Sequence, residues 1–296
     1  MKILLAGGSG FLGGALRSAL LSDGHSIANL TRRRTPAEPG DAFWMPDGTA
    51  GDWAGVLDGV DAVVNLAGAG IADRRWSAGR KREIESSRLL ATRSLVAAIQ
   101  LASRPPQVLV SASGVGYYGP RGGEIVTEST TPGRDFLAAV CIAWEREAEK
   151  ASSLARVATV RTGLVLDAEG GALARMLLPF RFGVGGRLGS GAQFMPWIHR
   201  DDWVRLVRWM IAEPDARGPF NATAPNPVAN AEFSRALGRA LHRPAVLPVP
   251  AIALRVALGE MADLLLAGQR AIPAKAMEMG FRFRFTTLDE ALADLF

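Results

Sequence analysis

The sequence has few of the residues that form disulfides and metal sites. Among 296 residues there is one cysteine, Cys141, and there are three histidines, His25, His199 and His242. A single cysteine excludes an intramolecular disulfide and a thiolate-rich metal site. Because the histidines lie far apart along the chain, they show no metal-ligand spacing. We therefore expect no bound metal ion.

Long apolar runs are also missing, and no uninterrupted run is long enough to cross a bilayer. Residues 1–16, MKILLAGGSGFLGGAL, start like a secretory signal, with one lysine followed by apolar residues. Their glycines favour another interpretation, and no small-residue cleavage site follows cleanly. We therefore expect a cytoplasmic protein without a membrane partner.

Lysine and arginine outnumber aspartate and glutamate, so the formal net charge is +5 and the pI is about 10.0. The basic segments TRRR (31–34) and DRRWSAGRKRE (73–83) raise the alternative of a nucleic-acid partner. Arginines, however, are spread along the whole chain, and neither a helix-turn-helix nor paired stacking aromatics can be recognised. Because basic loops also suit an anionic dinucleotide, we expect no nucleic-acid partner.

The first 165 residues alternate short apolar runs with helical patterns. The patterns predict strands at 2–6, 26–30, 61–66, 107–111 and 157–161, and helices at 11–21, 78–102 and 135–153. Strands separated by helices form right-handed crossovers, which build a parallel sheet covered on both faces. The predicted fold class is α/β, a Rossmann-type doubly wound parallel sheet.

Beyond Gly170 the regularity is weaker. We expect a short extended segment and an amphipathic helix within 195–213, a strand at 219–222, helices at 231–241, 250–268 and 287–296, and a strand at 281–285. We therefore divide the chain into a dinucleotide-binding domain, 1–168, and a smaller mixed α/β C-terminal lobe, 169–296, with later segments returning to the sheet. The lobe should fold against the carboxyl edge of the sheet, where such folds bind ligands.

Glycines follow the first predicted strand at a regular spacing. In LLAGGSGFLGGAL, Gly7, Gly10 and Gly13 form a G-x-x-G-x-x-G pattern that leads into the first helix. Glycine at such positions permits a tight turn, close approach of the backbone to a pyrophosphate, and close contact of helix and sheet. The start of the helix then offers free N–H groups to phosphates. A plain strand–helix turn is the alternative, but the position of the motif favours a dinucleotide site.

The end of the second predicted strand distinguishes NAD from NADP. An acidic residue there would hold the 2′-hydroxyl of the adenosine ribose, whereas arginine suits a 2′-phosphate. The chain reads NLTRRR, with Thr31, Arg32 and Arg33 and no carboxylate before Glu38. Guanidinium groups bind phosphate in a bidentate manner. This turn therefore predicts NADP(H), with a solvated basic turn as the alternative.

Five motifs of the chain recur in one known superfamily. They are GGSGFLG (7–13), NLAG (65–68), SASGVGYYG (111–119), RTGLVL (161–166) and WIHRDD (197–202). On these motifs the chain resembles the extended short-chain dehydrogenase/reductase superfamily, the NAD(P)-dependent sugar epimerases and dehydratases. More narrowly, NLAGAGIADRRWSAGRKREIESSRLLAT, DFLAAVCIAWE and GEMADLLLAGQRAIPAKAMEMGFRF are similar to its YfcH-like epimerase-family group. The resemblance covers nearly the full length and implies an NADP(H)-binding Rossmann domain with a C-terminal substrate lobe.

The resemblance implies a catalytic set that this chain has only in part. In the superfamily a serine or threonine acts with a tyrosine that transfers a proton, and a lysine one helical turn later binds the nicotinamide ribose. Ser111 and Ser113 are available for the serine role. At the positions of the tyrosine and the lysine the chain has Cys141 and Glu145. Glu145 is expected to accept hydrogen bonds from the nicotinamide ribose.

Two interpretations of Cys141 stay open. It falls on an apolar stripe of the helix 135–153, as a buried small hydrophobe would, or it shuttles protons with Glu145, although a neighbouring carboxylate raises a thiol pKa. The two tyrosines, Tyr117 and Tyr118, lie in GVGYYGPRGG, outside that helix. Tyr118 matches a turn beside the substrate pocket, and a direct acid–base role for either tyrosine is the alternative.

Three other positions have two interpretations each. Arg161 either lies at the nicotinamide or anchors a nearby carboxylate. In WIHRDD, Asp201 caps the following helix, or His199 donates a proton. Arg187, in a glycine-rich segment, binds an anionic substrate or is solvated.

The residues predicted to bind the cofactor are Gly7, Gly8, Ser9, Gly10, Phe11, Leu12, Gly13, Thr31, Arg32, Arg33, Leu66, Ala67, Gly68, Ser111, Glu145, Gly163 and Leu164. The catalytic candidates are Ser113, Tyr118 and Cys141. We expect an NADP(H)-dependent nucleoside-diphosphate-sugar epimerase or a reductase that acts on an unidentified small anionic substrate and forms a homodimer. The alternative is a non-catalytic NADP(H)-binding module that senses redox state or regulates a partner, and the missing Tyr–Lys pair favours it.

Overall fold

A seven-stranded parallel sheet forms the centre of the protein, of which the computed structural model describes residues 1–33 and 40–296. Its strands are β1 (Lys2–Ala6), β2 (Ser26–Thr31), β3 (Ala42–Phe43), β4 (Ala62–Asn65), β5 (Val108–Gly114), β7 (Arg156–Thr162) and β11 (Gly218–Ala222). They lie in the order β11-β7-β5-β4-β1-β2-β3. The order reverses between β1 and β4, which creates a switch point at the carboxyl ends of these strands. The predicted fold class is confirmed.

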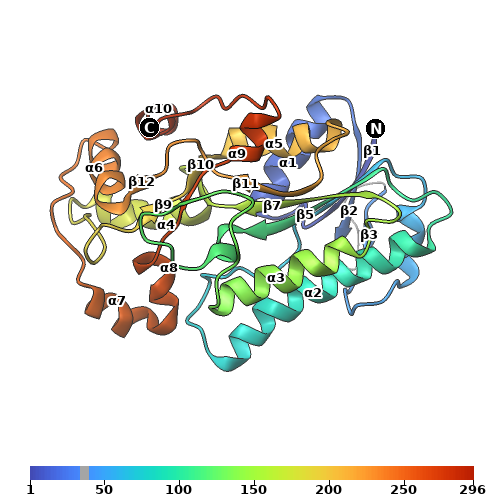
Figure 1. The fold of residues 1–296 in the computed structure, drawn as a ribbon, viewed down its shortest axis with the longest axis horizontal. Coiled ribbons are helices and arrows are strands. Elements are labelled where there is room, and N and C mark those ends of the chain that lie inside the picture. Colours follow the sequence, from blue (N-terminus) through green and yellow to red (C-terminus); the bar gives the residue numbers. More distant parts are fainter. Residues whose placement is uncertain (34–39) are drawn as a thin grey trace.

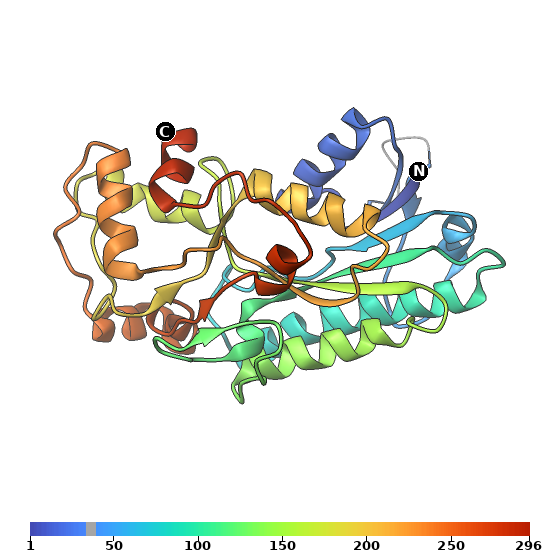
Figure 2. The ribbon, with the colours of Figure 1, turned by 45° about the horizontal axis from the view of Figure 1, so that its top comes forward.

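Helices cover both faces of the sheet (Figures 1 and 2). One face carries α1 (Phe11–Ser22) and α5 (Arg200–Ala212), and the other carries α2 (Ala78–Leu101) and α3 (Phe136–Glu149). In β1, Ile3 and Leu5 pack toward α1 and α5, whereas Leu4 and Ala6 pack toward α2 and α3. Both sides of the strand are therefore buried, which explains its unbroken apolar run.

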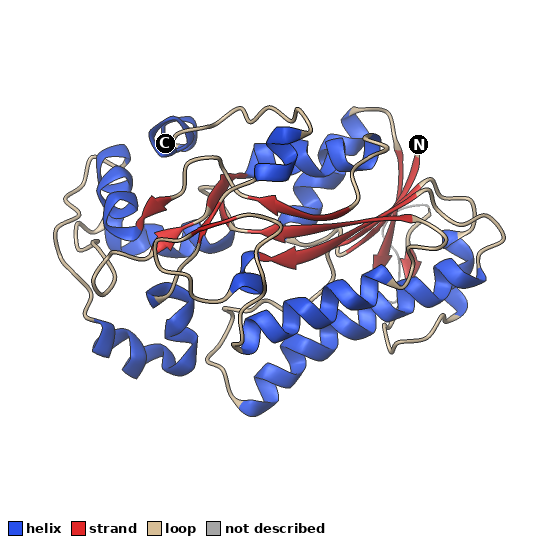
Figure 3. Ribbon diagram, viewed as in Figure 1, coloured by secondary structure: helices blue, strands red, loops and turns tan. Residues whose placement is uncertain are grey.

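A smaller lobe lies to the left of the sheet in Figure 3. Its core joins α4 (Gly171–Arg181), α6 (Asn230–Ala240) and α10 (Leu288–Leu295). Outside the seven-stranded sheet, the described residues form three short strand pairs: β8 (Leu164–Leu166) with β10 (Trp197–His199), β9 (Phe194–Met195) with β12 (Val228–Ala229), and β6 (Ile125–Val126) with β13 (Arg270–Ala271). The other helices are α7 (Ala251–Leu258), α8 (Asp263–Leu266), α9 (Ala274–Glu278), η1 (Asp52–Leu57), η2 (Val115–Tyr118) and η3 (Gly259–Ala262).

The predicted strand at 281–285 is wrong. Its side chains alternate as expected, with Phe281 and Phe285 buried, but the segment is irregular. The backbone N–H groups of Arg284 and Phe285 donate to the carboxylate of Asp202, each at 2.8 Å. A buried carboxylate therefore satisfies the backbone groups that a partner strand would otherwise bind.

The lobe differs from the expected helices in two further places. The helix expected at 250–268 is interrupted at Gly259, whose φ of +61° ends α7, and the chain continues through η3 and α8. Helix α4 is not among the expected helices, because it contains Pro179 and starts at Gly171, directly after Gly170. None of the described helices is both long enough and apolar enough to cross a membrane.

Candidate functional site

The loop between β1 and α1 forms a cradle in which two glycines leave no room for any larger residue. Gly7 has a φ of +89°, and a Cβ there would lie 2.8 Å from the carbonyl carbon of Leu66. A Cβ at Gly13 would lie 2.8 Å from the Cα of Gly8 and would overlap the carbonyl oxygen of Gly7. Both positions therefore require glycine if the loop is to keep this shape.

The start of α1 is open to an anion. Its N-cap residue is Gly10, which makes no side-chain cap hydrogen bond, and its first turn contains no acidic residue. The N–H groups of a first helical turn have no partner within the helix, and they carry partial positive charge. Ser9, Gly10 and Phe11 are exposed. The arrangement fits the pyrophosphate of a dinucleotide.

The loop after β4 lies against this cradle. Leu66 and Ala67 approach the backbone of Gly7, and Gly68 packs against the side chain of Arg88 on α2. The fold thus brings together two predicted cofactor segments, 7–13 and 66–68, at the switch point of the sheet. This is where ligands of open α/β sheets bind.

Two residues that the sequence analysis did not identify support the loop. The side chain of Asn29, on β2, lies so close to Gly8 that a Cβ on Gly8 would overlap its Oδ1. The backbone N–H and Nδ2 of Asn29 donate to Oδ1 of Asp41 at 2.9 and 2.8 Å. Asn29 could have been found from the sequence, because it is an asparagine within a strand predicted to be buried. A buried amide requires hydrogen-bond partners.

The basic turn after β2 is exposed. Thr31 ends the strand, and its Oγ1 accepts a hydrogen bond from the N–H of Arg33 at 3.1 Å. The side chains of Arg32 and Arg33 are accessible, whereas Arg34 and Glu38 lie outside the described residues. Two guanidinium groups are therefore available to an anionic ligand beside the cradle.

A buried ion pair involves the residue at the expected lysine position. Arg161, on β7, donates from Nε and Nη2 to the two carboxylate oxygens of Glu145, on α3, at 2.8 and 2.7 Å. The two side chains are only 3% and 14% exposed. Although burial lowers the pKa of Arg161, the hydrogen bonds and charge of Glu145 raise it above its ordinary value. Of the two interpretations of Arg161, the structure supports the anchor of a carboxylate.

Ser113 completes this cluster. It stands at the end of β5 and donates from Oγ to Oε1 of Glu145 at 2.7 Å. Ser111, two residues earlier, is fully buried, and its Oγ has no partner among the described residues. Ser113 is therefore the serine that contacts the ionic cluster, and the site prediction for Ser111 stays a prediction.

Tyr118 is fully buried and bonded within the protein. Its hydroxyl donates to Oδ1 of Asn221 at 2.7 Å and accepts from Nη1 of Arg161 at 3.0 Å. Burial raises the pKa of Tyr118 to about 12. Near neutral pH such a phenol is a poor acid–base group. Tyr117 also contacts the cluster, with Cζ of Arg161 lying 3.4 Å from its ring centroid.

Cys141 lies in the core of the interface between α3 and the sheet. Its exposure is 7%, and its Sγ would be 3.9 Å from a Cβ on Gly114. Burial, followed by the charge of Glu145, raises the pKa of Cys141 to about 11. Because the thiol is protonated at neutral pH, the structure favours the buried hydrophobe over the proton shuttle.

The last predicted cofactor segment, Gly163 and Leu164, packs against Pro196. A Cβ on Gly163 would overlap the carbonyl oxygen of Pro196, and the N–H of Leu164 donates to the same oxygen at 2.7 Å. Arg187, the candidate for an anionic substrate, donates from Nη1 to the carbonyl oxygens of Ser190 and Gly189 at 2.7 and 3.4 Å. Arg187 thus stabilises its own loop.

The prediction that Asp201 caps α5 is wrong. The N-cap residue is His199, whose Nδ1 accepts from the N–H of Asp201 at 3.1 Å. Burial lowers the pKa of His199, and a neutral ring that accepts at Nδ1 carries its proton on Nε2. His199, Asp201 and Asp294 are close enough for a metal group. However, a protonated Nε2 is no ligand, and Arg284 pairs with both carboxylates at 3.6 and 3.3 Å.

Comparisons with known proteins agree with this geometry. The sequence model of the NAD dependent epimerase/dehydratase family matches residues 3–222, and a domain of unknown function, DUF1731, matches residues 249–295. The epimerase family protein Mb2239 of Mycobacterium bovis is 45% identical over 98% of this chain and 96% of its own length. The Arabidopsis thaliana protein described as epimerase family protein SDR39U1 homolog, chloroplastic, is 42% identical over 99% of this chain and 86% of its own. The crystal structure of human epimerase family protein SDR39U1 with NADPH is 36% identical with a TM-score of 0.92, covering 100% of this chain and 99% of that one.

Proposed function

Because the chain belongs to the NAD dependent epimerase/dehydratase family, we propose that it is an NADP(H)-dependent epimerase-type oxidoreductase that acts on a hydroxyl group of a small substrate. The membership confirms the resemblance found in the sequence. The observation that carries the proposal is the hydrogen bond from Ser113 to the Glu145–Arg161 ion pair. This cluster lies at the same carboxyl edge of the sheet as the glycine cradle.

The cradle and the basic turn suit NADP(H). The N-terminus of α1 would hold the pyrophosphate, and Arg32 and Arg33 would hold the adenosine 2′-phosphate. Crystals of the human relative that is 36% identical contain NADPH, which supports the phosphorylated cofactor. When bound, its nicotinamide exchanges a hydride with a substrate carbon.

We assign Ser113 to the substrate hydroxyl because it stands at the carboxyl end of β5, although its side chain is as buried as that of Cys141, with exposures of 6% and 7%. Since its own proton is donated to Glu145, the lone pairs of Ser113 Oγ can accept a hydrogen bond from the substrate. Ser113 would therefore orient the substrate hydroxyl toward the nicotinamide, and its hydrogen bond to Glu145 would fix the direction in which Oγ presents its lone pairs. Arg161 holds that carboxylate in place from the opposite side.

A non-catalytic NADP(H)-binding module is the second candidate function. The observation that favours it is the absence of an accessible acid–base group at the usual positions. Cys141 replaces the tyrosine and has a raised pKa of about 11, and Tyr118 is buried with a raised pKa of about 12. Such a module would bind the cofactor without turning over a substrate.

Stopped-flow fluorescence of bound NADPH and NADP⁺ separates the two functions. Alcohols and carbonyl compounds, including nucleotide sugars, would be mixed with the cofactor complex. For an oxidoreductase we expect a compound that changes the redox state of the cofactor. Ser113→Ala should slow that reaction about 100-fold without changing NADPH affinity, and Ser152→Ala, at an exposed serine after α3, should not. Stoichiometric binding without turnover across the library would support the module, and full activity in Ser113→Ala would refute the serine's role.

Further expectations from the sequence belong to this proposal. We propose that residues 169–296 provide the substrate side of the site and that the substrate is anionic, which the net charge of +5 supports. The homodimer and the cytoplasmic location stay predictions, and the name of the plant relative places that protein in the chloroplast.

A further inference from the structure

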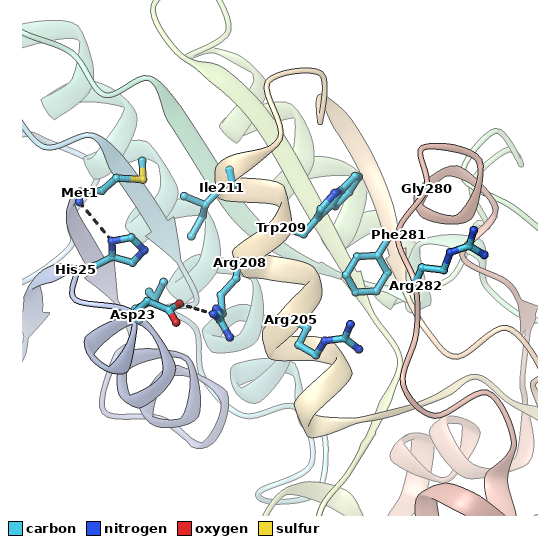
Figure 4. A pocket seen from close by; sticks show the side chains of 12 residues that line it. Met1, Asp23, His25, Arg205, Arg208, Trp209, Ile211, Gly280, Phe281 and Arg282 are labelled. Atoms are coloured by element: carbon cyan, nitrogen blue, oxygen red, sulfur yellow. Dashed lines mark hydrogen bonds and ion pairs between the residues drawn. The ribbon is translucent and has the colours of Figure 1, made fainter.

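The segment that the domain of unknown function covers lies along one edge of the central sheet. Strand β11 is the last strand of that sheet, and helix α9, within residues 249–295, lies against it. Further along, the ring centroid of Phe281 lies 5.6 Å from that of Trp209 on α5, and Trp209 lies 5.8 Å from Phe220 on β11. Figure 4 shows Trp209 and Phe281 side by side at the edge of a cavity on the outer face of α5. The C-terminal segment therefore covers the edge strand.

Asn221, on β11, connects this segment to Tyr118. Its Nδ2 donates to the carbonyl oxygen of Ile272 at 2.9 Å, and its Oδ1 accepts from the hydroxyl of Tyr118 at 2.7 Å. Asn221 and Tyr118 are both 0% exposed. The carboxylate of Glu128 accepts from the backbone N–H groups of Asn221 and Lys275 at 2.9 and 3.2 Å. Asn221 is therefore tied to the C-terminal segment through its side chain and its backbone.

The chemistry of the outer groups fixes the direction of these hydrogen bonds. A backbone carbonyl only accepts, so the amide nitrogen of Asn221 must face Ile272 and its oxygen must face Tyr118. A guanidinium only donates, so Nη1 of Arg161 donates to the oxygen of Tyr118 at 3.0 Å, which leaves the hydroxyl proton for Asn221. A reversed amide would set Oδ1 against the Ile272 carbonyl and deprive the hydroxyl proton of its acceptor.

The C-terminal segment also encloses the ring of Tyr118. The ring packs with Val126 on β6 and Ala271 on β13, and these two strands are paired. Val126 and Ala271 are as fully buried as the tyrosine. A buried hydroxyl that loses its acceptor finds no water to replace it, so the loss costs more than the net value of the bond. The position of Tyr118 therefore depends on residues 270–272.

Tyr118 in turn contacts the ionic cluster at Ser113. Arg161 spans the two, since its Nη1 donates to Tyr118 while its Nε and Nη2 donate to Glu145. Glu145 also accepts from Ser113. Because a guanidinium is rigid and planar, a shift of Tyr118 that turns the group moves both donors that hold Glu145. The carbonyl of Ile272 is thus connected to Ser113 through an unbroken series of hydrogen bonds.

We propose that the domain of unknown function, residues 249–295, positions the ionic cluster, and that Asn221 is the positioning residue through which it acts. The inference rests on the proposed function for the role of Ser113 alone, because the hydrogen bonds from Ile272 to Glu145 require neither cofactor nor substrate. It gives the C-terminal domain a task behind the cluster, in addition to the substrate side of the lobe.

Urea unfolding of the full chain measures the coupling in a double-mutant cycle. Asn221 and Glu145 are separated by Tyr118 and Arg161, so a purely local role of Asn221 predicts that Asn221→Leu and Glu145→Gln multiply in their effects on the unfolding equilibrium constant. We expect instead that Asn221→Leu raises this constant about tenfold or more. Glu145→Gln should then cost about tenfold less than in the wild type. In Tyr118→Phe, which lacks the linking hydroxyl, the two effects should multiply.

Asn226→Leu is the matched control. Asn226 also donates from Nδ2 to a carbonyl oxygen of the C-terminal segment, that of Thr286 at 3.0 Å, but it is exposed and lies outside the series of bonds that leads to Tyr118. The effect of Asn226→Leu on unfolding should therefore multiply with that of Glu145→Gln.

A second measurement separates positioning from cofactor binding. With a substrate from the stopped-flow library, Asn221→Leu should slow cofactor oxidation at saturating substrate about tenfold. The affinity for NADPH should stay unchanged, because Asn221 lies outside the glycine cradle. Asn226→Leu should change neither quantity.

Two outcomes would overturn the inference. They are effects of Asn221→Leu and Glu145→Gln that multiply in the wild-type background, and an unchanged rate of cofactor oxidation in Asn221→Leu. Neither outcome bears on the assignment of Ser113, which Ser113→Ala tests by itself. If Asn221→Leu does not fold, Asn221→Ser enters the same cycle, because its short hydroxyl cannot bridge Ile272 and Tyr118.

Discussion

The buried ion pair between Glu145 and Arg161 gives the sharpest test of the structure. Glu145→Gln preserves the shape of the side chain but removes its charge, so Arg161 stays as a cation with a side chain only 3% exposed. Glu145 accepts three hydrogen bonds, two from Arg161 and one from Ser113. Removing one partner of a buried pair costs about 3–5 kcal/mol, which is a large part of the 5–15 kcal/mol that typically stabilises a protein.

Urea unfolding followed by tryptophan fluorescence measures this cost. Glu149→Gln makes the same change one turn further along α3, at an exposed position, and should alter the free energy of unfolding by less than about 0.5 kcal/mol. Arg161→Met should cost as much as Glu145→Gln, and the double variant should lose less than the sum, because neither charge is left unpaired. A loss below about 1 kcal/mol in Glu145→Gln, or additive losses in the double variant, would refute the reasoning.

Two further predictions concern the cofactor turn and the buried thiol. Arg32→Ala should weaken NADPH binding about 10- to 100-fold in fluorescence titration and leave NADH binding unchanged; equal losses for both would exclude contact with the 2′-phosphate. The folded-state pKa of Cys141 is raised from its ordinary value of 9.0 to about 11, so its contribution to stability is complete below pH 9 and is lost as the pH rises toward 11. The loss amounts to about 2 kcal/mol. In urea unfolding Cys141→Ala should decline correspondingly less over that interval, and identical curves would show that the thiol ionises freely.

The doubly wound half of the molecule could be predicted because its signals are local. Lys2–Ala6 is a strand buried on both faces, so it reads as one apolar run, and the helix that follows opens on three regularly spaced glycines. The long helix at Ala78–Leu101 is capped by Ser77, whose side chain accepts from the N–H of Arg80. Such caps and periodicities lie within a few residues of one another.

The rest could not be predicted because its partners are distant in sequence. Alternation at 281–285 indicated a strand, but Asp202, about 80 residues earlier, binds the backbone there. The strands β6, β9, β12 and β13 have two residues each, too few to show a period. Glu145 and Arg161 stand on a helix and a strand, so their pairing depends on how α3 packs against β7.

The most direct test of the account is equilibrium titration with NADPH of the wild type and of two variants that replace adjacent glycines, Gly13→Ala and Gly14→Ala. A Cβ on Gly13 would overlap Gly7, whereas a Cβ on Gly14 would lie 4.0 Å from the nearest carbonyl oxygen, that of Gly8. Both substitutions replace glycine by alanine in α1, so they affect helix propensity alike. We predict one NADPH per chain for the wild type and for Gly14→Ala, and a loss of at least about 100-fold for Gly13→Ala. Equal affinities in the two variants, or no binding by the wild type, would contradict the assignment of the cradle.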